Sequence, residues 1–418
     1  MNKLNVIYNG WSERWPLGVL AEFGHRSLFE YSPEALSQSL ELSPFRLALR
    51  QPAYEGSETF LEGLPGLIAD ALPDGWGRLL MDRRFRKAGR DPAEVSVLER
   101  LAFIGDRALG ALSFEPAEGL ALTTQDVSLL ELAQRIDRLT AGASAAVLNE
   151  LLLIGGSPQG ARPKALVRYE RGSGRMSAGE ARIGARIDPG GAPGEDWLIK
   201  FPARGEHAEA CAIEELYARS ARTCGIDMPD SEFFPLGRGL AAFGVKRFDR
   251  KAGMRVPIHT LAGALHADYR VPAVDAIDFL RMTRLMTNDM REVRKAFERC
   301  VFNLALHNRD DHAKNFSYRL GRDRRWQLAP AYDLTFSVGP RGHHQMAYAG
   351  ETAAPILADV LRVAAKGGID AATALGCVKR VRAMAAGLEK SADGLPIRKA
   401  SLRTIVKAVA ANCARLKL

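Results

Sequence analysis

Cysteines and long apolar runs are both scarce in this sequence. The five cysteines among 418 residues are an odd number, lie far apart and include no CxxC pair. This pattern argues against a disulfide framework or a zinc ribbon and is typical of a protein of the reducing cytosol. No segment approaches the roughly 18 consecutive apolar residues of a membrane span, and the first residues lack the features of a secretory signal. We therefore expect a cytoplasmic protein with no membrane partner.

Acidic residues are scarce near the C-terminus. Lys and Arg total 58 against 49 Asp and Glu, which gives a formal net charge of 58 − 49 = +9. Residues 353–418 contain twelve basic and four acidic residues, so they carry +8, and residues 1–352 carry the remaining +1. This distribution excludes an acidic disordered tail protein. A basic excess by itself is compatible with a nucleic acid, with phosphate ligands or with no anionic partner at all.

The length predicts two or three domains of roughly 150 residues each. Residues 1–116 have the pattern of a small α+β unit, and residues 117–249 that of a strand-rich unit containing a Gly/Ser turn and a strand lysine. Residues 250–418 are mostly helical, with a polar loop and basic helices near the end. Periodicity therefore predicts an α+β protein that ends in a helical unit.

Two local expectations concern the first part. Residues 45–50 (FRLALR) alternate in the manner of a short strand. The segment LPDGWGRLLMDRRFRKAG predicts a helix that starts near Asp74 and buries Leu79, Leu80 and Phe85 on one side.

The densest polar chemistry lies in LALHNRDDHAKNFSYR. A helical pattern precedes it, because one face collects Val293, Phe297, Cys300, Val301 and Leu304. Such a helix would deliver residues 308–315 as a rigid loop at its C-terminus. In this loop Asp310 and Asn315 are separated by four residues, as Asp and Asn are in the catalytic loop of phosphoryl-transfer enzymes. Asp310 could accept a proton from a hydroxyl, and Asn315 could bind Mg²⁺, a cation that prefers oxygen ligands.

Further along, Asp333 follows the apolar run LAPAY and could return a second carboxylate to the same cation. Upstream, DWLIKFP places Lys200 in an otherwise apolar strand, where a lysine needs an anionic partner or an edge position that reaches water. GGSPQGARPKALV is a glycine-rich turn that matches neither the Walker A loop nor GxGxxG. The alternative is a solvated turn with an ordinary surface Asp. The order of these parts favours a two-lobed protein-kinase-like fold.

A rival interpretation takes His307, Asp311 and His312 as ligands of a metal-dependent phosphohydrolase, although a second distant His/Asp pair is missing. His343 and His344 could also bind a metal, but adjacent histidines on a Gly/Pro loop are expected to be exposed. A third hypothesis is a catalytically silent kinase-like protein that binds its partners without turnover. The presence of all three oxygen-bearing residues of the kinase-like site disfavours it.

The sequence resembles the HipA family of serine/threonine kinases, the toxins of bacterial HipBA-type type II toxin–antitoxin modules. The segments that carry the resemblance are LPDGWGRLLMDRR, FIGDRALGALSFEP, SPQGARPKALV, WLIKFP, VKRFDR, LHNRDDHAKNFS and LAPAYDLTFS. They extend over nearly the whole chain. The resemblance implies a two-lobed kinase preceded by an N-terminal subdomain. It also implies ATP and Mg²⁺ as cofactors.

The resemblance further implies roles for individual residues. Asp310 would be the catalytic base, Asn315 and Asp333 would hold Mg²⁺, and Glu214 would brace Lys200. Residues 245–248 would form the hinge against which adenine stacks. The nucleotide-binding residues that it implies are Ser157, Gln159, Gly160, Ala161, Lys164, Lys200, Glu214, Lys246, Arg247, Phe248, His312, Lys314, Asn315, Tyr332 and Asp333.

Regulation and partners are implied in the same way. Ser157 occupies the position at which the family is autophosphorylated, and about −2 charges added there would expel the loop and disable ATP binding. A helix-turn-helix, HipB-like antitoxin is the expected partner, and a translation-related protein such as an aminoacyl-tRNA synthetase is the expected substrate. If the chain is catalytically silent, the resemblance implies instead a corepressor that acts on an antitoxin–operator complex.

The sequence departs from the family pattern at two places. Residues 161–164 read Ala-Arg-Pro-Lys where members often have a Gln-Glu-Lys-like stretch, and Lys246 stands where an acidic hinge residue is common. In the basic C-terminal part, the simplest interpretation is a solvated helix face. The alternative is contact with operator phosphates, within the antitoxin complex, through Lys379, Arg382, Arg403 and Lys407.

Overall fold

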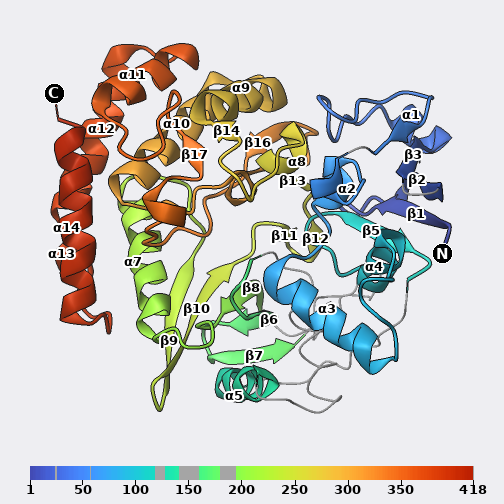
Figure 1. The fold of residues 1–418 in the computed structure, drawn as a ribbon, viewed down its shortest axis with the longest axis horizontal. Helices are drawn as coiled ribbons and strands as arrows, with labels where there is room; N and C mark the ends of the chain where they lie inside the picture. The colour runs from blue at the N-terminus through green and yellow to red at the C-terminus, as the bar shows by residue number, and fades with distance from the viewer. Residues whose placement is uncertain (24–25, 57, 118–127, 141–159, 179–193, 418) are drawn as a thin grey trace. The chain divides into compact units, whose positions relative to one another are not determined.

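A computed structural model describes most of the chain and divides it into two compact units (Figure 1). The described residues are 1–23, 26–56, 58–117, 128–140, 160–178 and 194–417. Unit 1 comprises residues 1–42, 47–211 and 230–258, and unit 2 comprises residues 43–46, 212–229 and 259–418. Each unit is described by itself below.

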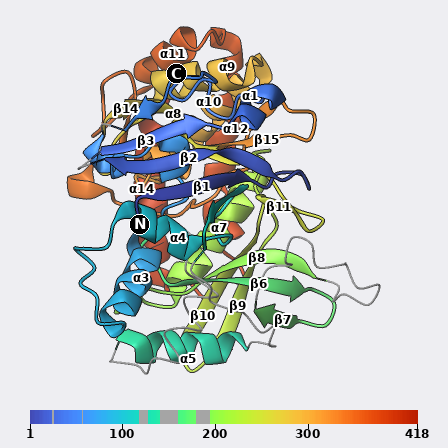
Figure 2. The same cartoon turned by 90° about the vertical axis from the view of Figure 1, so that its right-hand side faces the viewer.

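Unit 1 begins with a five-stranded antiparallel sheet in the order β4-β3-β2-β1-β5. Its strands are β1 (Lys3–Tyr8), β2 (Trp15–Phe23), β3 (Arg26–Tyr31), β4 (Tyr54–Glu55) and β5 (Leu112–Glu115). Figure 2 shows β3, β2 and β1 side by side. The helical elements are α1 (Pro33–Gln38), η1 (Thr59–Leu61), α2 (Gly66–Ala69), α3 (Gly75–Lys87) and α4 (Val97–Ile104). Helix α4 packs on β1 and β2. It starts at a capping box in which Ser96 and Glu99 satisfy each other's backbone N–H groups.

A second five-stranded sheet of unit 1 has the order β7-β6-β8-β10-β9. Its strands are β6 (Lys164–Glu170), β7 (Arg175–Ala178), β8 (Glu195–Lys200), β9 (Ser231–Gly237) and β10 (Leu240–Lys246). Helix α5 (Leu129–Thr140) contacts β10, and a short hairpin of β11 (Arg250–Lys251) and β12 (Met254–Arg255) follows. Antiparallel pairing of β6 with β8 sets Lys164 directly opposite Lys200. Directly opposed residues share one face of a sheet, so both lysines lie on the same side.

A buried ionic cluster links the two sheets of unit 1. The Asp249 carboxylate accepts hydrogen bonds from Arg247, from Arg250 and from the Gly110 N–H, all between 2.8 and 3.0 Å. Arg255 also donates to the carbonyl oxygens of Asp106, Gly110 and Leu112, the last of which is the first residue of β5. Burial alone would raise the pKa of Asp249, but the two guanidinium groups outweigh it and hold that pKa well below its usual range. The hinge segment after β10 is thereby fixed to the first sheet.

Unit 2 is mostly helical. Its helical elements are the main part of α7 (Glu209–Thr223), α8 (Leu261–Leu265), α9 (Ala276–Thr287), α10 (Met290–Ala305), η2 (Ala313–Asn315), η3 (Pro340–Gly342), α11 (Leu357–Lys366), α12 (Ala371–Ala386), α13 (Leu388–Ser391) and α14 (Lys399–Arg415). Its strands are β13 (Ile258–Thr260), β14 (Val274–Asp275), β15 (Ser317–Leu320), β16 (Trp326–Leu328) and β17 (Met346–Ala347). Helix α10 packs against α9, α12 and α14 and forms the centre of the unit.

The structure confirms the helix predicted before the polar loop. Asp289 caps α10 by accepting a hydrogen bond from the Arg291 N–H, and the predicted apolar face is buried in full. Two other predictions are wrong. Residues 44–46 form a turn and residues 45–50 contain no strand, and Leu79 is 39 % exposed although Leu80 and Phe85 are buried. Within the described ranges, no helix combines the length and hydropathy that a membrane crossing requires.

Candidate active site

The polar loop of unit 2 leaves the C-terminus of α10 in a fixed direction. His307, directly after the helix cap, has a left-handed backbone with φ of 58°, which turns the chain. The buried Asn308 then bonds back to Asn303, both through its backbone N–H (2.9 Å) and through its Nδ2 (3.0 Å). The two carboxylates that follow are therefore delivered by a rigid helix, as the sequence predicted.

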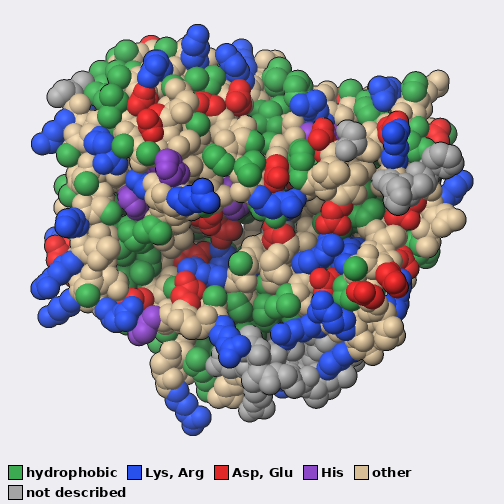
Figure 3. Space-filling view, viewed as in Figure 1, with side chains coloured by type: hydrophobic (Ala, Val, Ile, Leu, Met, Phe, Trp, Pro, Cys, Tyr) green, Lys and Arg blue, Asp and Glu red, His purple; other side chains and the backbone are tan. Residues whose placement is uncertain are grey.

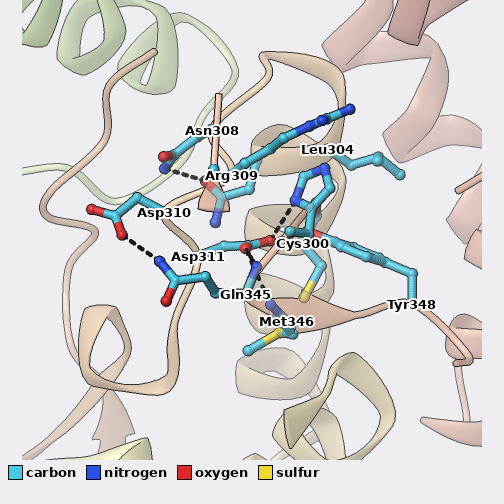
Figure 4. Close-up of polar contacts among 12 residues, drawn as sticks. Cys300, Leu304, Asn308, Arg309, Asp310, Asp311, Gln345, Met346 and Tyr348 are labelled. Atoms are coloured by element: carbon cyan, nitrogen blue, oxygen red, sulfur yellow. Dashed lines mark hydrogen bonds and ion pairs between the residues drawn. The ribbon is translucent and has the colours of Figure 1, made fainter. Parts of the chain in front are cut away.

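Asp311 is the structural carboxylate of this loop. Its side chain is 1 % exposed, and it accepts four hydrogen bonds (Figure 4). The donors are His344 Nδ1 (2.8 Å), the Gln345 N–H (2.8 Å), the Met346 N–H (3.2 Å) and the Tyr348 hydroxyl (3.1 Å). Burial, reinforced by the charge of Asp311, raises the pKa of Tyr348, so this hydroxyl remains a donor. Asp311 ties the loop to residues 344–348.

Asp310 has a different environment, although it is the adjacent residue. Its side chain is 46 % exposed and receives one side-chain hydrogen bond, from Gln345 Nε2 at 2.7 Å. Partial burial is the main cause that raises the pKa of Asp310; His312 opposes it, and the charges of Asp333 and Asp311 add to it. A half-exposed carboxylate with a raised pKa suits a residue that takes up a proton.

The two predicted cation ligands lie beside Asp310. Asn315 Nδ2 donates to the carbonyl oxygen of Asp310 at 2.7 Å, so its Oδ1 is the atom presented to other ligands. Asp333 acts on the pKa of Asp310 through its charge and has a left-handed backbone with φ of 53°. Tyr332 donates a hydrogen bond to the Lys314 carbonyl oxygen at 2.7 Å and so joins the two segments. The Asn315 amide oxygen and the Asp333 carboxylate fit the predicted role of Mg²⁺ ligands, because a hard cation prefers oxygen ligands.

His312 and Lys314 both lie against Tyr269. The Lys314 Nζ is 4.2 Å from the centroid of the Tyr269 ring, and the His312 ring centroid is 5.4 Å from it. His312 Nε2 is 3.8 Å from Asp310 Oδ1. The structure therefore places His312 beside Asp310, and Lys314 shares with His312 the contact with Tyr269. Their predicted role at the phosphates stays a prediction.

In unit 1, the residues predicted to bind phosphate gather on one face of β6 and β8. Lys164 and Lys200 are 4 % and 5 % exposed and lie opposite each other across the strand pair. Gly160 has a φ of 104°, and a Cβ at this position would lie 2.5 Å from Lys164 Nζ. Glycine is therefore favoured at position 160 by its backbone conformation, and a larger residue would also displace the Lys164 ammonium group. Two buried ammonium groups on one face are suited to an anionic ligand.

The start of helix α3 holds Gly160 in place. Asp74 accepts a hydrogen bond from the Gly160 N–H, and the Trp76 N–H donates to the Gly160 carbonyl oxygen at 3.0 Å. Gly75 lies between them with a φ of 41°, where a Cβ would come within 2.6 Å of the Gly160 oxygen. The LPDGWG motif thus forms a close backbone contact with the end of the glycine-rich segment, which the sequence did not reveal.

The predicted hinge residues have partners within unit 1. Lys246 pairs with Glu195 and Arg247 with Asp249, and Phe248 is half-buried. The Arg247 side chain is therefore committed to the buried cluster and is not available to a nucleotide. A nucleotide contact from Arg247 would therefore come from its backbone, whereas the contacts of Lys246 and Phe248 with a nucleotide stay predictions.

Four other residues were predicted to bind the nucleotide, and the described structure leaves the role of each a prediction: Ala161, Ser157, Gln159 and Glu214. Ala161 is exposed, and Ser157 and Gln159 lie outside the described residues. Glu214 is buried on α7, but it belongs to unit 2 whereas Lys200 belongs to unit 1, so their pairing stays a prediction.

The hydrolase interpretation fits the geometry poorly. Asp311 has all its partners within the fold, and His307 faces elsewhere, with its Nδ1 3.1 Å from Asn412 Nδ2 and its ring stacked on Phe336. Burial, together with the charge of Arg309, lowers the pKa of His307 to about 4. Among the described residues, no group of three or more His, Cys, Asp or Glu side chains could hold a metal. The predicted exposure of His344 is wrong, because its side chain is 1 % exposed against Asp311.

The candidate DNA-contacting residues lie on two packed helices. On α12 Lys379 is exposed and Arg382 is half-buried, while on α14 Arg403 and Lys407 are exposed. Figure 3 shows Lys and Arg side chains along the left edge of this view, where α14 lies in Figure 1. The apolar side of α14 buries Ile405 and Val409.

Family comparison agrees with this geometry. The HipA N-terminal domain matches residues 5–115, and the HipA-like C-terminal domain matches residues 156–390. The chain belongs to the HipA family. No curated protein matches its sequence.

Solved structures show which fold this HipA-family chain has. It is similar to a structure described as the Shewanella oneidensis MR-1 toxin–antitoxin system HipA, HipB and its operator DNA complex, with a TM-score of 0.70 and 16 % identity over 99 % of this chain and 96 % of that one. A Helicobacter pylori proinflammatory kinase, CtkA, matches 54 % of this chain and 86 % of its own at 11 % identity and a TM-score of 0.41. The likeness to the HipA structure confirms the predicted α+β, two-lobed fold with an N-terminal subdomain.

Proposed function

We propose that this chain is an ATP- and Mg²⁺-dependent serine/threonine protein kinase that acts as the toxin of a HipBA-type module. The observation that carries the proposal is the arrangement in unit 2, where Asp310 lies beside Asn315 and Asp333. The paired buried lysines 164 and 200 in unit 1 add a face suited to phosphates.

In the proposed reaction, Asp310 accepts the proton of the attacking serine or threonine hydroxyl. Asn315 and Asp333 would hold Mg²⁺, which when bound neutralises charge on the transferring phosphoryl group. Lys200 and Lys164 bind the anionic end of the nucleotide. Asp311 takes no part in proton transfer, because its two oxygens are saturated by four donors. Catalysis then rests on positioning and charge neutralisation.

Incubation of the purified chain with γ-labelled ATP, Mg²⁺ and a bacterial lysate tests the reaction class. Labelled protein supports the kinase. Release of phosphate from phosphate esters without ATP would support the phosphohydrolase instead. Nucleotide or antitoxin binding without turnover would support a catalytically silent corepressor.

The substrate is proposed to be a translation-related protein of the cytoplasm, with an aminoacyl-tRNA synthetase as the first candidate. This step rests on family membership. Phosphoproteomics after brief induction, comparing the wild type with Asp310→Asn, identifies the substrate directly. Sites that gain phosphate with both proteins would not be substrates.

Autophosphorylation at Ser157 is proposed as the off-switch. Phosphate on Ser157 would add about −2 charges to the glycine-rich segment that ends at Gly160. Substitution Ser157→Ala is expected to leave phosphate transfer to other proteins intact and to abolish incorporation into the chain itself. Mass spectrometry of the chain after incubation with ATP measures this. Phosphate found at another residue of the wild type would contradict the assignment.

An antitoxin of the helix-turn-helix, HipB-like class is the proposed partner, and operator DNA would be contacted only in complex with it. If Arg403 and Lys407 touch phosphates, replacing both with Ala should make the plot of log affinity against log salt shallower by roughly 2. The measurement is DNA binding by the antitoxin complex across salt concentrations. Arg238→Ala with Lys251→Ala removes the same charge from exposed positions of unit 1 and serves as the matched control. An equal slope in both double variants would leave only a solvated helix face.

A further inference from the structure

Gln345 contacts the proposed catalytic base from a segment far away in sequence. Its Nε2 donates to Asp310 Oδ1 at 2.7 Å, which leaves Oδ2 as the other carboxylate oxygen. In Figure 4 that second oxygen points away from Gln345. The Asp310 carboxylate is thus held through one oxygen and presents the other.

The backbone of Gln345 is itself fixed on both sides. Its N–H and that of Met346 donate to Asp311 Oδ1, and the ring of the preceding His344 bonds to Asp311 Oδ2. Strand β17, which starts at Met346, pairs in parallel with β14 through Val274. The side chain of Gln345 therefore extends from a rigid platform. The direction of the Gln345 amide toward Asp310 is therefore set by the bonds of the backbone and of His344 to Asp311, and not by the amide itself.

Asp310 needs such a holder because of the charges around it. Asp311 and Asp333 both repel its carboxylate, and His312 attracts it from 3.8 Å on the Oδ1 side. A half-exposed side chain under these forces has several rotamers available. The hydrogen bond from the Gln345 amide to Oδ1 selects one rotamer of Asp310, and the neutral amide adds no charge.

We propose that Gln345 is a positioning residue of the phosphoryl-transfer reaction, which holds Asp310 so that Oδ2 meets the attacking hydroxyl. The inference rests on the proposed kinase function. This role differs from a structural one. The bonds that tie this segment to Asp311 are made by the backbone and by the side chains of His344 and Tyr348, whereas the Gln345 amide bonds to Asp310.

The test compares three substitutions in the full chain. Gln345→Met keeps the length and removes the donor, Gln345→Lys keeps a donor, and His343→Gln changes the neighbouring exposed residue, whose ring bonds to Thr352. Initial rates of transfer from γ-labelled ATP to lysate protein are measured across ATP concentrations, with melting temperatures for each variant. We expect Gln345→Met to lower the maximal rate roughly 10- to 100-fold, the effect of losing a hydrogen bond to a charged group, with little change in the apparent KM for ATP. Gln345→Lys should recover most of the rate, and His343→Gln should match the wild type.

The outcomes are separable. A maximal rate in Gln345→Met equal to that of the wild type, or a Gln345→Lys rate as low as that of Gln345→Met at equal melting temperatures, overturns the positioning role. If Gln345→Met and Gln345→Lys both lose rate together with a lower melting temperature, Gln345 has a structural role, and the positioning role is again overturned. If the wild type itself transfers no phosphate, the proposed kinase function fails instead.

Discussion

Asp310→Asn is expected to lower phosphate transfer from ATP by roughly 10²- to 10⁴-fold, the usual contribution of a positioned general base. The amide cannot accept the hydroxyl proton, although it has nearly the same shape as the carboxylate. ATP binding should persist, because the paired lysines and Gly160 belong to another part of the chain. Incorporation of label into protein measures the effect, and growth after induction measures the loss of toxicity.

The fold should survive this substitution. Asp310 is half-exposed, and its carboxylate accepts one side-chain hydrogen bond, from Gln345. The midpoint of thermal unfolding should therefore stay close to that of the wild type, which serves as the control. Labelling that persists at the wild-type rate in a folded Asp310→Asn protein would refute the assignment of the base.

Asp311→Ala is expected to have the opposite profile, with a loss of roughly 3–5 kcal/mol of folding free energy. The substitution leaves four donors without their acceptor in a fully buried position. The donors connect the loop after α10 to residues 344–348, so these two segments should separate first. Phosphate transfer should fall as a consequence, because Gln345 loses the platform that aims it at Asp310.

Chemical denaturation measures the loss of stability, and hydrogen exchange at the amides of Gln345 and Met346 measures the local opening. The adjacent Asp310→Asn variant is a natural control, because it changes a carboxylate on the same loop with little effect on folding. Wild-type stability in Asp311→Ala would contradict the structural role given to this residue. An Asp311→Ala protein that is stable but inactive would instead indicate that Asp311 takes part in the reaction.

The sequence predicted elements whose signal is local. The apolar stripe of α10 and its Asp289 cap lie within one stretch of chain, so periodicity sufficed to place the loop that follows. The pair Asp310 and Asn315 could be recognised for the same reason, since their spacing is fixed by the loop itself. The strand predicted at residues 45–50 failed because alternation over six residues is weak. Residues 43–46 lie instead with unit 2, where Ser43 bonds to the buried His259 at 2.9 Å.

The distinction between the two neighbouring carboxylates required the tertiary structure. Asp310 and Asp311 are identical in type and adjacent, and the residues that differentiate them lie more than thirty positions away. The sequence predicted an exposed His344 and no role for Gln345, because neither residue lies in a pattern that reveals its partner. Likewise, the hold of Asp74 and Trp76 on Gly160 joins segments more than eighty residues apart.

What the sequence alone determined was therefore the family, the order of the elements and the residue types of the proposed site. Long-range hydrogen bonds decided the rest: which carboxylate is buried and saturated, which one stays half-exposed with a raised pKa, and which side chain holds it. The physical reason is that residue type and spacing constrain the chain over a few turns only. Burial and charge at one atom depend on whatever the fold packs against it.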